Sequence, residues 1–222
     1  MQGSEQYNPI ALQYSELFAD ENQLSISAYF KHINYPLSGK KVLDLGCGDG
    51  YDLSLLAKCS ASLHGVDASE EMLRLAKQKN PQAEFKHGYF ERIPYADHTF
   101  DVVLSKWAIQ TSANIAPIYQ EVHRVLKPQG VFQFLVSHPI RTFLEKKKHP
   151  KDYFKQEMVD SHIFKGQIVV RDPSHTMNEF LSPFFLQHFD LIAYEEGFDA
   201  GAEKVDGDTY PIFFIIKAIK RS

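Results

Sequence analysis

The sequence predicts an α/β fold built on a doubly wound, mostly parallel sheet, and two observations support this prediction. Short β-like runs alternate with helical patterns between residues 41 and 137, as expected for a parallel sheet covered by helices. A glycine-rich segment, 46–50, directly follows the first of these runs. Ligands of such sheets bind beyond the carboxyl ends of the strands, so candidate site residues are expected there.

The alternating region is expected to contain five strands and three helices. The strands are predicted at 41–45, 63–67, 83–87, 100–104 and 131–137, and the helices at 51–58, 69–76 and 114–126. Ser69 is the predicted N-cap of the second helix, because its hydroxyl can accept a hydrogen bond from the first turn and two acidic residues follow it. The stretch Lys127-Pro128-Gln129-Gly130 predicts the end of the third helix.

The flanking regions predict a cap and a closing pair of strands. Apolar residues at near-helical spacing predict helix over 8–32, divided near Asn22. After Pro139 we expect an insertion over 139–160, a strand over 163–170, a helix over 176–188, and closing strands, antiparallel in part, over 191–195 and 211–219. The chain is therefore expected to be one domain with four parts: an N-terminal helical cap (1–38), a cofactor-binding half (40–137), a cap or insertion (138–190) and closing strands (191–222).

The composition is that of an ordinary globular protein. The chain has 222 residues, 44% of them hydrophobic and 23% charged, which excludes a disordered chain, a fibrous repeat and a disulfide-rich miniprotein. A net charge of −4 and a pI of about 6.2 give no electrostatic reason to expect nucleic acid as a partner. Two cysteines, no recognisable secretory leader and no long apolar run predict a cytoplasmic protein without a membrane partner. The oligomeric state is left open.

The strongest local signal is the glycine segment together with Asp67. Glycines let the backbone turn sharply and leave no Cβ in the way of a ligand. Asp67 ends the next strand, 21 residues after Gly46, where a carboxylate can accept both ribose hydroxyls of a nucleoside. The pattern is G-x-G-x-G with Tyr51 at the sixth position, and no Lys-Ser or Lys-Thr pair follows. This favours a nucleoside without a pyrophosphate over NAD or ATP.

Together these motifs resemble the class I S-adenosylmethionine-dependent methyltransferases, in the branch that acts on small molecules. Residues 42–50 are similar to the first motif of that family, 65–73 to the second, 88–103 to the third and 121–130 to the stretch before the fifth strand. The likeness spans about residues 40–137. It implies a Rossmann-like fold, S-adenosylmethionine as cofactor, and methyl transfer to a small-molecule acceptor.

The resemblance also implies a set of cofactor contacts. Tyr14 is expected to cover the cofactor, Asp67 to hold the ribose, and Asp44 to orient the loop or to reach the methionine ammonium through water. The remaining implied contacts are Gly46, Cys47 and Gly48 along methionine and ribose, Ala68, Met72, Tyr89 and Phe90 around adenine, and Ser105 closing the site. Tyr89 stands where the family commonly has an acidic residue, and Gln129 replaces a usual glycine.

The acceptor side of the site carries weaker signals. His138, just past the fifth strand, and His175 are candidate general bases, since a histidine titrates near neutral pH; His138 could equally brace the turn at Pro139. Candidate substrate residues are Trp107, Gln110, Arg141 and Tyr153. No metal is expected, because no histidine lies within five residues of another.

Two other functions stay open at this point. The first is a non-catalytic module that binds S-adenosylmethionine or a protein partner. The second is a nicotinamide-dependent reductase, which Tyr51 at the sixth position of the glycine pattern disfavours. A nucleic-acid methyltransferase is disfavoured, because Ser105-Lys106-Trp107-Ala108 stands where the amino-methylating DNA enzymes carry Asn/Asp-Pro-Pro-aromatic, and because neither cysteine follows a proline.

Overall fold

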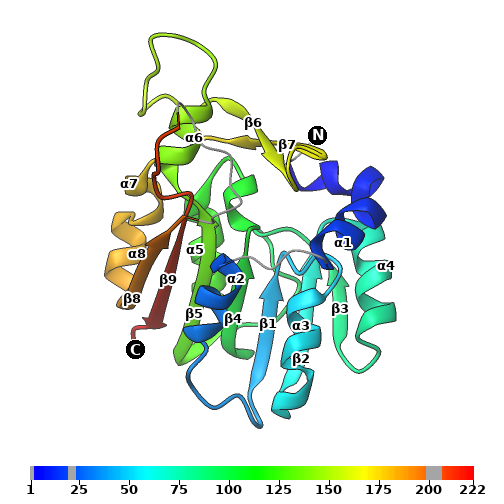
Figure 1. The fold of residues 1–222 in the computed structure, drawn as a ribbon. Coiled ribbons are helices and arrows are strands. Elements are labelled where there is room, and N and C mark those ends of the chain that lie inside the picture. Colours follow the sequence, from blue (N-terminus) through cyan, green and yellow to red (C-terminus); the bar gives the residue numbers. More distant parts are fainter. Residues whose placement is uncertain (1–2, 20–23, 199–206) are drawn as a thin grey trace.

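The fold is organised around one central sheet. The structure is a computed structural model, and it describes residues 3–19, 24–198 and 207–222. Seven strands lie in the order β3-β2-β1-β4-β5-β9-β8 (Figure 1). Their bounds are Lys41–Leu45 (β1), Ser62–Asp67 (β2), Glu84–His87 (β3), Phe100–Lys106 (β4), Leu126–Ser137 (β5), Phe189–Gly197 (β8) and Phe213–Lys220 (β9). β1 to β5 pair in parallel, and β9 pairs antiparallel with both β5 and β8. The predicted α/β fold with an antiparallel closing strand is confirmed.

Helices cover both faces of the sheet (Figure 1). Their bounds are Leu24–Lys31 (α2), Tyr51–Leu56 (α3), Glu70–Lys79 (α4), Ile115–Val125 (α5), Met177–Phe180 (α7) and Pro183–His188 (α8), with 3-10 turns at Ala57–Cys59 (η2) and Ile109–Thr111 (η3). On one face, α5, α7 and α8 bury apolar side chains against Phe132 and Phe134 of β5. On the other face, Tyr29 of α2 packs against Leu135, and Leu56 of α3 joins a cluster with Val42. Burial on both faces explains why the parallel strands read as nearly continuous apolar runs.

Three further elements lie over the carboxyl ends of the parallel strands (Figure 1). The N-terminal cap consists of a 3-10 helix, η1 (Gly3–Ile10), and α1 (Ala11–Ala19). Helix α6 (Pro139–Glu145) follows β5, and an antiparallel hairpin, β6 (Met158–Ile163) with β7 (Ile168–Pro173), reaches from α6 towards the cap. These elements roof the end of the sheet at which ligands of this fold class bind.

The structure differs from the sequence-based prediction in the cap and roof. The expected division of helix 8–32 near Asn22 lies outside the described residues, although α1 ends at Ala19 and α2 begins at Leu24. The single strand expected at 163–170 is wrong, because residues 164–167 form a turn that joins two strands, with positive φ at Phe164, Lys165 and Gly166. The single helix expected at 176–188 is also wrong: it is two short helices, the second of which starts at Pro183.

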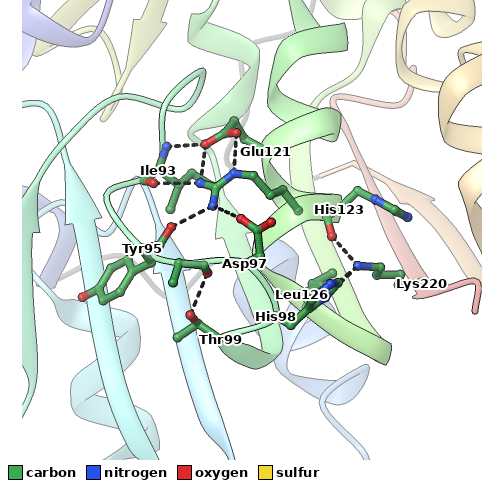
Figure 2. A network of polar contacts seen from close by, with 11 residues as sticks. Ile93, Tyr95, Asp97, His98, Thr99, Glu121, His123, Leu126 and Lys220 are labelled. Atoms are coloured by element: carbon green, nitrogen blue, oxygen red, sulfur yellow. Dashed lines mark hydrogen bonds and ion pairs between the residues drawn. The ribbon is translucent and has the colours of Figure 1, made fainter.

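A polar network fixes the loop between β3 and β4, which carries Tyr89 and Phe90. The Arg124 guanidinium of α5 donates to the carbonyl oxygens of Ile93 (3.0 Å) and Tyr95 (2.8 Å) and to Asp97 Oδ1 (2.8 Å) (Figure 2). It also donates to both Glu121 oxygens, and Glu121 Oε2 accepts from the Ile93 amide. Because one guanidinium donates hydrogen bonds to several groups of this loop, the loop is held against α5.

Candidate cofactor and acceptor site

A cavity of about 940 Å³ lies at the carboxyl ends of β1, β2 and β4, beneath the N-terminal cap and the β6–β7 hairpin. Small-molecule sites occupy roughly 300–1,000 Å³, and this cavity lies near the upper end of that range. Its cofactor side is lined by Tyr14, Gly46, Gly48, Asp67, Ala68, Met72, Gly88, Tyr89, Phe90 and Glu91. Its other lining residues are Gln6, Tyr7, Lys106, Trp107, Ala108, Thr111, Ser112, Ala113, Asn114, Met158, Val169, Arg171 and Pro173.

The glycines of the loop after β1 serve two different purposes. Gly46, Gly48 and Gly50 all have positive φ (79°, 51° and 75°), a region that side chains with a Cβ rarely adopt. A Cβ at Gly46 would overlap Ala108, and one at Gly50 would lie 2.6 Å from Asn80 Nδ2. At Gly48, which lines the cavity, a Cβ would meet no protein atom within 4 Å. Gly46 and Gly50 therefore allow close packing, whereas Gly48 leaves open the space in which a ligand can approach the backbone.

Asp67 holds this loop in place and faces the cavity. Its Oδ2 accepts the Gly48 amide (2.8 Å), and its Oδ1 accepts the Ser69 amide (2.8 Å). Burial raises the pKa of the Asp67 carboxyl, and the backbone donors Ser69, Gly48 and Ala68 counteract that rise. Each oxygen keeps further acceptor capacity, so the carboxylate can receive two vicinal hydroxyls while it fixes the loop. Asp67 is therefore available for the ribose contact, which stays a prediction.

Three buried carboxylates lie around the loop, and cations neutralise two of them. Asp52 pairs with Lys106 (2.5 Å), and Asp49 pairs with Lys79 and also accepts the Ser15 hydroxyl. Asp44 is only 3% exposed; burial, then the neighbouring charge of Asp52, raises its pKa. Asp44 does not line the cavity. Of its two expected roles, orienting the loop or reaching the methionine ammonium through water, this favours the first.

The cavity brings together most of the predicted cofactor residues. Tyr14 enters from α1 with its ring edge-on to Tyr7, 5.6 Å between centroids. The two predicted contacts besides Asp44 that do not line the cavity are Cys47 and Ser105. The Ser105 hydroxyl donates to the Leu45 carbonyl (2.8 Å) and so ties β4 to β1. Burial raises the pKa of the Cys47 thiol, as in an unreactive cysteine.

Of the predicted acceptor-side residues, Trp107 alone lines the cavity. His138 Nδ1 accepts the Ile140 amide (3.1 Å) and caps α6, and its Nε2 lies 3.3 Å from Glu196. The alternative of a residue that braces the turn fits this geometry. The other predicted residues do not line the cavity and make contacts elsewhere: His175 Nε2 to the Gln110 carbonyl (3.0 Å), Arg141 to Glu145 (3.0 Å), and the Tyr153 hydroxyl as acceptor of the Met177 amide (2.8 Å).

Sequence reasoning missed the residues that the hairpin and η1 bring to the cavity, among them Gln6, Met158 and Arg171. No local motif marks them, because they reach the site only through the tertiary fold. Lys106 carried a usable signal, since it ends β4 at the carboxyl edge of the sheet.

Within the described ranges, no group of three or more His, Cys, Asp or Glu side chains is placed to hold a metal ion. Among the helices of the described residues, none is long and apolar enough to cross a membrane.

Comparisons with known proteins agree with this geometry. A family model described as a methyltransferase domain matches residues 43–134. An uncharacterized methyltransferase of Synechocystis sp. is 41% identical over 102 residues, covering 45% of this chain and 48% of the relative. A demethylmenaquinone methyltransferase of Chlorobaculum parvum is 40% identical over 91 residues, covering 40% of this chain and 38% of the relative. The matched region is thus less than half the length of either relative.

A solved structure extends the likeness to nearly the whole chain. A crystal structure from Listeria monocytogenes that is assigned to the S-adenosylmethionine-dependent methyltransferases superposes with a TM-score of 0.73 at 27% identity, covering 89% of this chain and 99% of that one. This coverage extends well beyond the residues 43–134 that the family model matches. The predicted resemblance to the class I S-adenosylmethionine-dependent methyltransferases, whose cofactor is S-adenosylmethionine, is therefore confirmed: residues 43–134 match a methyltransferase-domain model, and the related solved structure covers 89% of this chain.

Proposed function

We propose that this chain transfers the methyl group of S-adenosylmethionine to a nucleophilic atom of a small molecule held between the cofactor and the β6–β7 hairpin. The observation that carries the proposal is that one cavity joins Gly48 and Asp67 on one side to Trp107, Met158 and Val169 on the other. No protein segment therefore separates the space for the cofactor from the space for the acceptor, so the two molecules can contact each other in the cavity.

The described residues fit this cofactor. Open space at the Gly48 Cβ position supports the approach of a nucleoside to the backbone, and the Asp67 carboxylate, which lines the same cavity, supports a contact with its ribose hydroxyls. When bound, S-adenosylmethionine supplies an electrophilic methyl group, with the C–S electron pair leaving to sulfur. The chain's own task is to hold the acceptor atom in line with that bond and to exclude water.

The enclosure of the cavity supports a small acceptor. The N-terminal cap and the hairpin are joined by Gln6, whose Oε1 accepts the Arg171 amide (2.9 Å) and whose Nε2 donates to the Arg171 carbonyl (3.3 Å). The cap is joined to the cofactor half by Asn8, whose Oδ1 accepts the Ser69 hydroxyl (2.7 Å). The Chlorobaculum relative is named for demethylmenaquinone, which is a small molecule.

His138 and His175 are not proposed as the base at the transferred methyl group, because neither lines the cavity. An acceptor whose proton is lost to water before or after transfer needs no side-chain base.

We also propose a cytoplasmic location, which the two free thiols Cys47 and Cys59 support.

Calorimetric titration with S-adenosylmethionine tests the cofactor half. The wild-type protein is expected to bind it, and Asp67→Ala is expected to bind at least about tenfold more weakly, since a charged acceptor of two hydroxyls is lost. Asp190→Ala, which removes an exposed carboxylate of β8, is the matched control and is expected to bind normally. Equal affinity in the wild type and Asp67→Ala would refute the ribose contact.

Incubation with a metabolite extract tests turnover. Formation of S-adenosylhomocysteine above the level of protein alone is expected. Binding of the cofactor without product from any extract would instead indicate a non-catalytic binding module.

A further inference from the structure

The acceptor side of the cavity combines an apolar wall with one cation whose charge is not fully matched. Met158 and Val169 of the hairpin line the cavity and are 49% and 52% exposed. Trp107 and Pro173 add further apolar surface. Exposed apolar side chains gathered in a cavity indicate an apolar ligand.

Arg171 of β7 is the cation in this wall. Its Nε lies 3.2 Å from Asp160 Oδ1, but Asp160 Oδ2 also pairs with Lys147 (2.8 Å). Asp160 therefore shares its single negative charge between Arg171 and Lys147. The Arg171 side chain is 66% exposed, and among the described residues the structure gives its two terminal NH2 groups no partner.

Hydrogen bonds hold the Arg171 main chain, and the residue lines the cavity. Both its amide and its carbonyl are hydrogen-bonded by the Gln6 side chain. A guanidinium on a fixed strand presents a fork of donors that matches a carboxylate or phosphate.

The other charged lining residues do not compete for an anion. Lys106 is neutralised by Asp52. Asp67 receives two backbone amides, and Glu91 Oε1 receives the Ser112 hydroxyl (2.6 Å); both carboxylates belong to the cofactor half.

We propose that the acceptor is an amphipathic acid: an apolar body that lies against Trp107, Met158 and Val169, with an anionic group that binds Arg171. This inference rests on the proposed function, because it names the chemical class of the acceptor in the same cavity. Arg171 is thereby a specificity residue that binds the substrate away from the reacting atom.

The experiment uses octanoate and its neutral isostere octanamide as probes. Trp107 is the only tryptophan in the chain and lines the cavity, so its fluorescence reports occupancy without turnover. Octanoate is expected to bind about tenfold more tightly than octanamide, the scale of one charge-assisted hydrogen bond at a partly exposed site.

Two substitutions decide the source of this preference. Arg171→Gln is expected to abolish the tenfold difference, while Arg171→Lys is expected to retain part of it. Lys165→Gln removes a cation from the turn of the same hairpin, outside the cavity, and is the matched control that is expected to keep the full preference. Because the Arg171 and Lys165 side chains are both exposed, little effect of the three substitutions on folding is expected, and circular dichroism checks this.

The outcomes separate this inference from the proposed function. If S-adenosylmethionine binds but octanoate and octanamide bind equally, or neither probe binds, the amphipathic-acid proposal is overturned while methyl transfer stands. A preference for octanoate that survives Arg171→Gln also overturns it. If the preference for octanoate depends on Arg171 but the protein does not bind S-adenosylmethionine, the anion site at Arg171 is supported and the proposed methyl transfer is refuted.

Discussion

Gly48 and Gly39 form a pair that separates backbone strain from ligand contact. Both have positive φ (51° and 72°), and at both positions a Cβ would meet no protein atom within 4 Å. Gly48 lines the cavity, whereas Gly39 lies in the turn before β1 and does not. Alanine at either site must adopt the same strained left-handed backbone, but only at Gly48 does the new methyl group enter the space reserved for a ligand.

The strain sets the expected loss of stability. Left-handed backbone costs a residue with a Cβ about 1 kcal/mol more than glycine. In a chain of this size that corresponds to roughly 2–4 °C in melting temperature. Both Gly39→Ala and Gly48→Ala should therefore lower the melting temperature by a similar small amount.

The two variants should differ in cofactor binding. A methyl group at position 48 would occupy the open space beside the loop, where it meets no protein atom within 4 Å but would meet a ligand that approaches the backbone. We expect Gly48→Ala to bind S-adenosylmethionine at least about tenfold more weakly, a free-energy loss of about 1.4 kcal/mol, and Gly39→Ala to bind like the wild type. Thermal melts and calorimetry on the same samples measure both quantities. Wild-type affinity in Gly48→Ala would show that the cofactor does not approach this loop, and equal losses in both variants would show that strain alone weakens binding.

Two further predictions concern stability. Burial raises the pKa of Asp172 to about 6, more than the hydrogen bond from Gln6 and the charge of Arg141 lower it. The wild-type protein therefore loses stability, relative to Asp172→Asn, as the pH rises from about 4 to 6. Denaturant unfolding should show that Asp172→Asn is more stable by about 2–3 kcal/mol at pH 7.5 and equally stable below about pH 4; a gain that does not change with pH would contradict the assignment. Lys106→Met leaves Asp52 buried without its cation and should cost about 3–5 kcal/mol. Asp52→Asn added to Lys106→Met should recover most of that loss in the same unfolding assay, and a double variant no more stable than Lys106→Met would show that the charge of Asp52 is not the cause.

The cofactor half could be predicted from the sequence because its determinants are local. The loop at Gly46–Gly50 and the carboxylate of Asp67 are each contiguous with the strand that positions them, and two parallel neighbouring strands bring their ends together. Of the implied contacts in this half, Asp44, Cys47 and Ser105 fall just behind the cavity wall. Asp44 and Ser105 lie within β1 and β4, where side chains alternate between the two faces of the sheet, so a motif identifies the strand end but not which face of it a ligand touches.

The acceptor half could not be predicted in the same way, because it is assembled from distant segments. The contact between Gln6 and Arg171 spans 165 residues, and neither residue carries a local signal. His138 and His175 attracted attention for their chemistry, yet a buried imidazole is equally suited to cap a helix or to accept and donate within a loop. Their actual contacts, with Ile140 and with the Gln110 carbonyl, are of this kind.

The different origins of the two halves bear on how acceptor and cofactor binding can vary. The 3-10 helix η1 contacts both, through Asn8 at the start of α4 and through Gln6 on β7. Apart from this link, the hairpin residues Met158, Val169 and Arg171 share no described hydrogen bond with the glycine loop or Asp67. Substitutions on the cavity side of the hairpin can therefore change the size and charge of the acceptor compartment without altering the groups that hold the nucleoside. Changes at Gln6 or Asn8, in contrast, act on the element that positions both halves, so their effects on cofactor and acceptor binding are coupled.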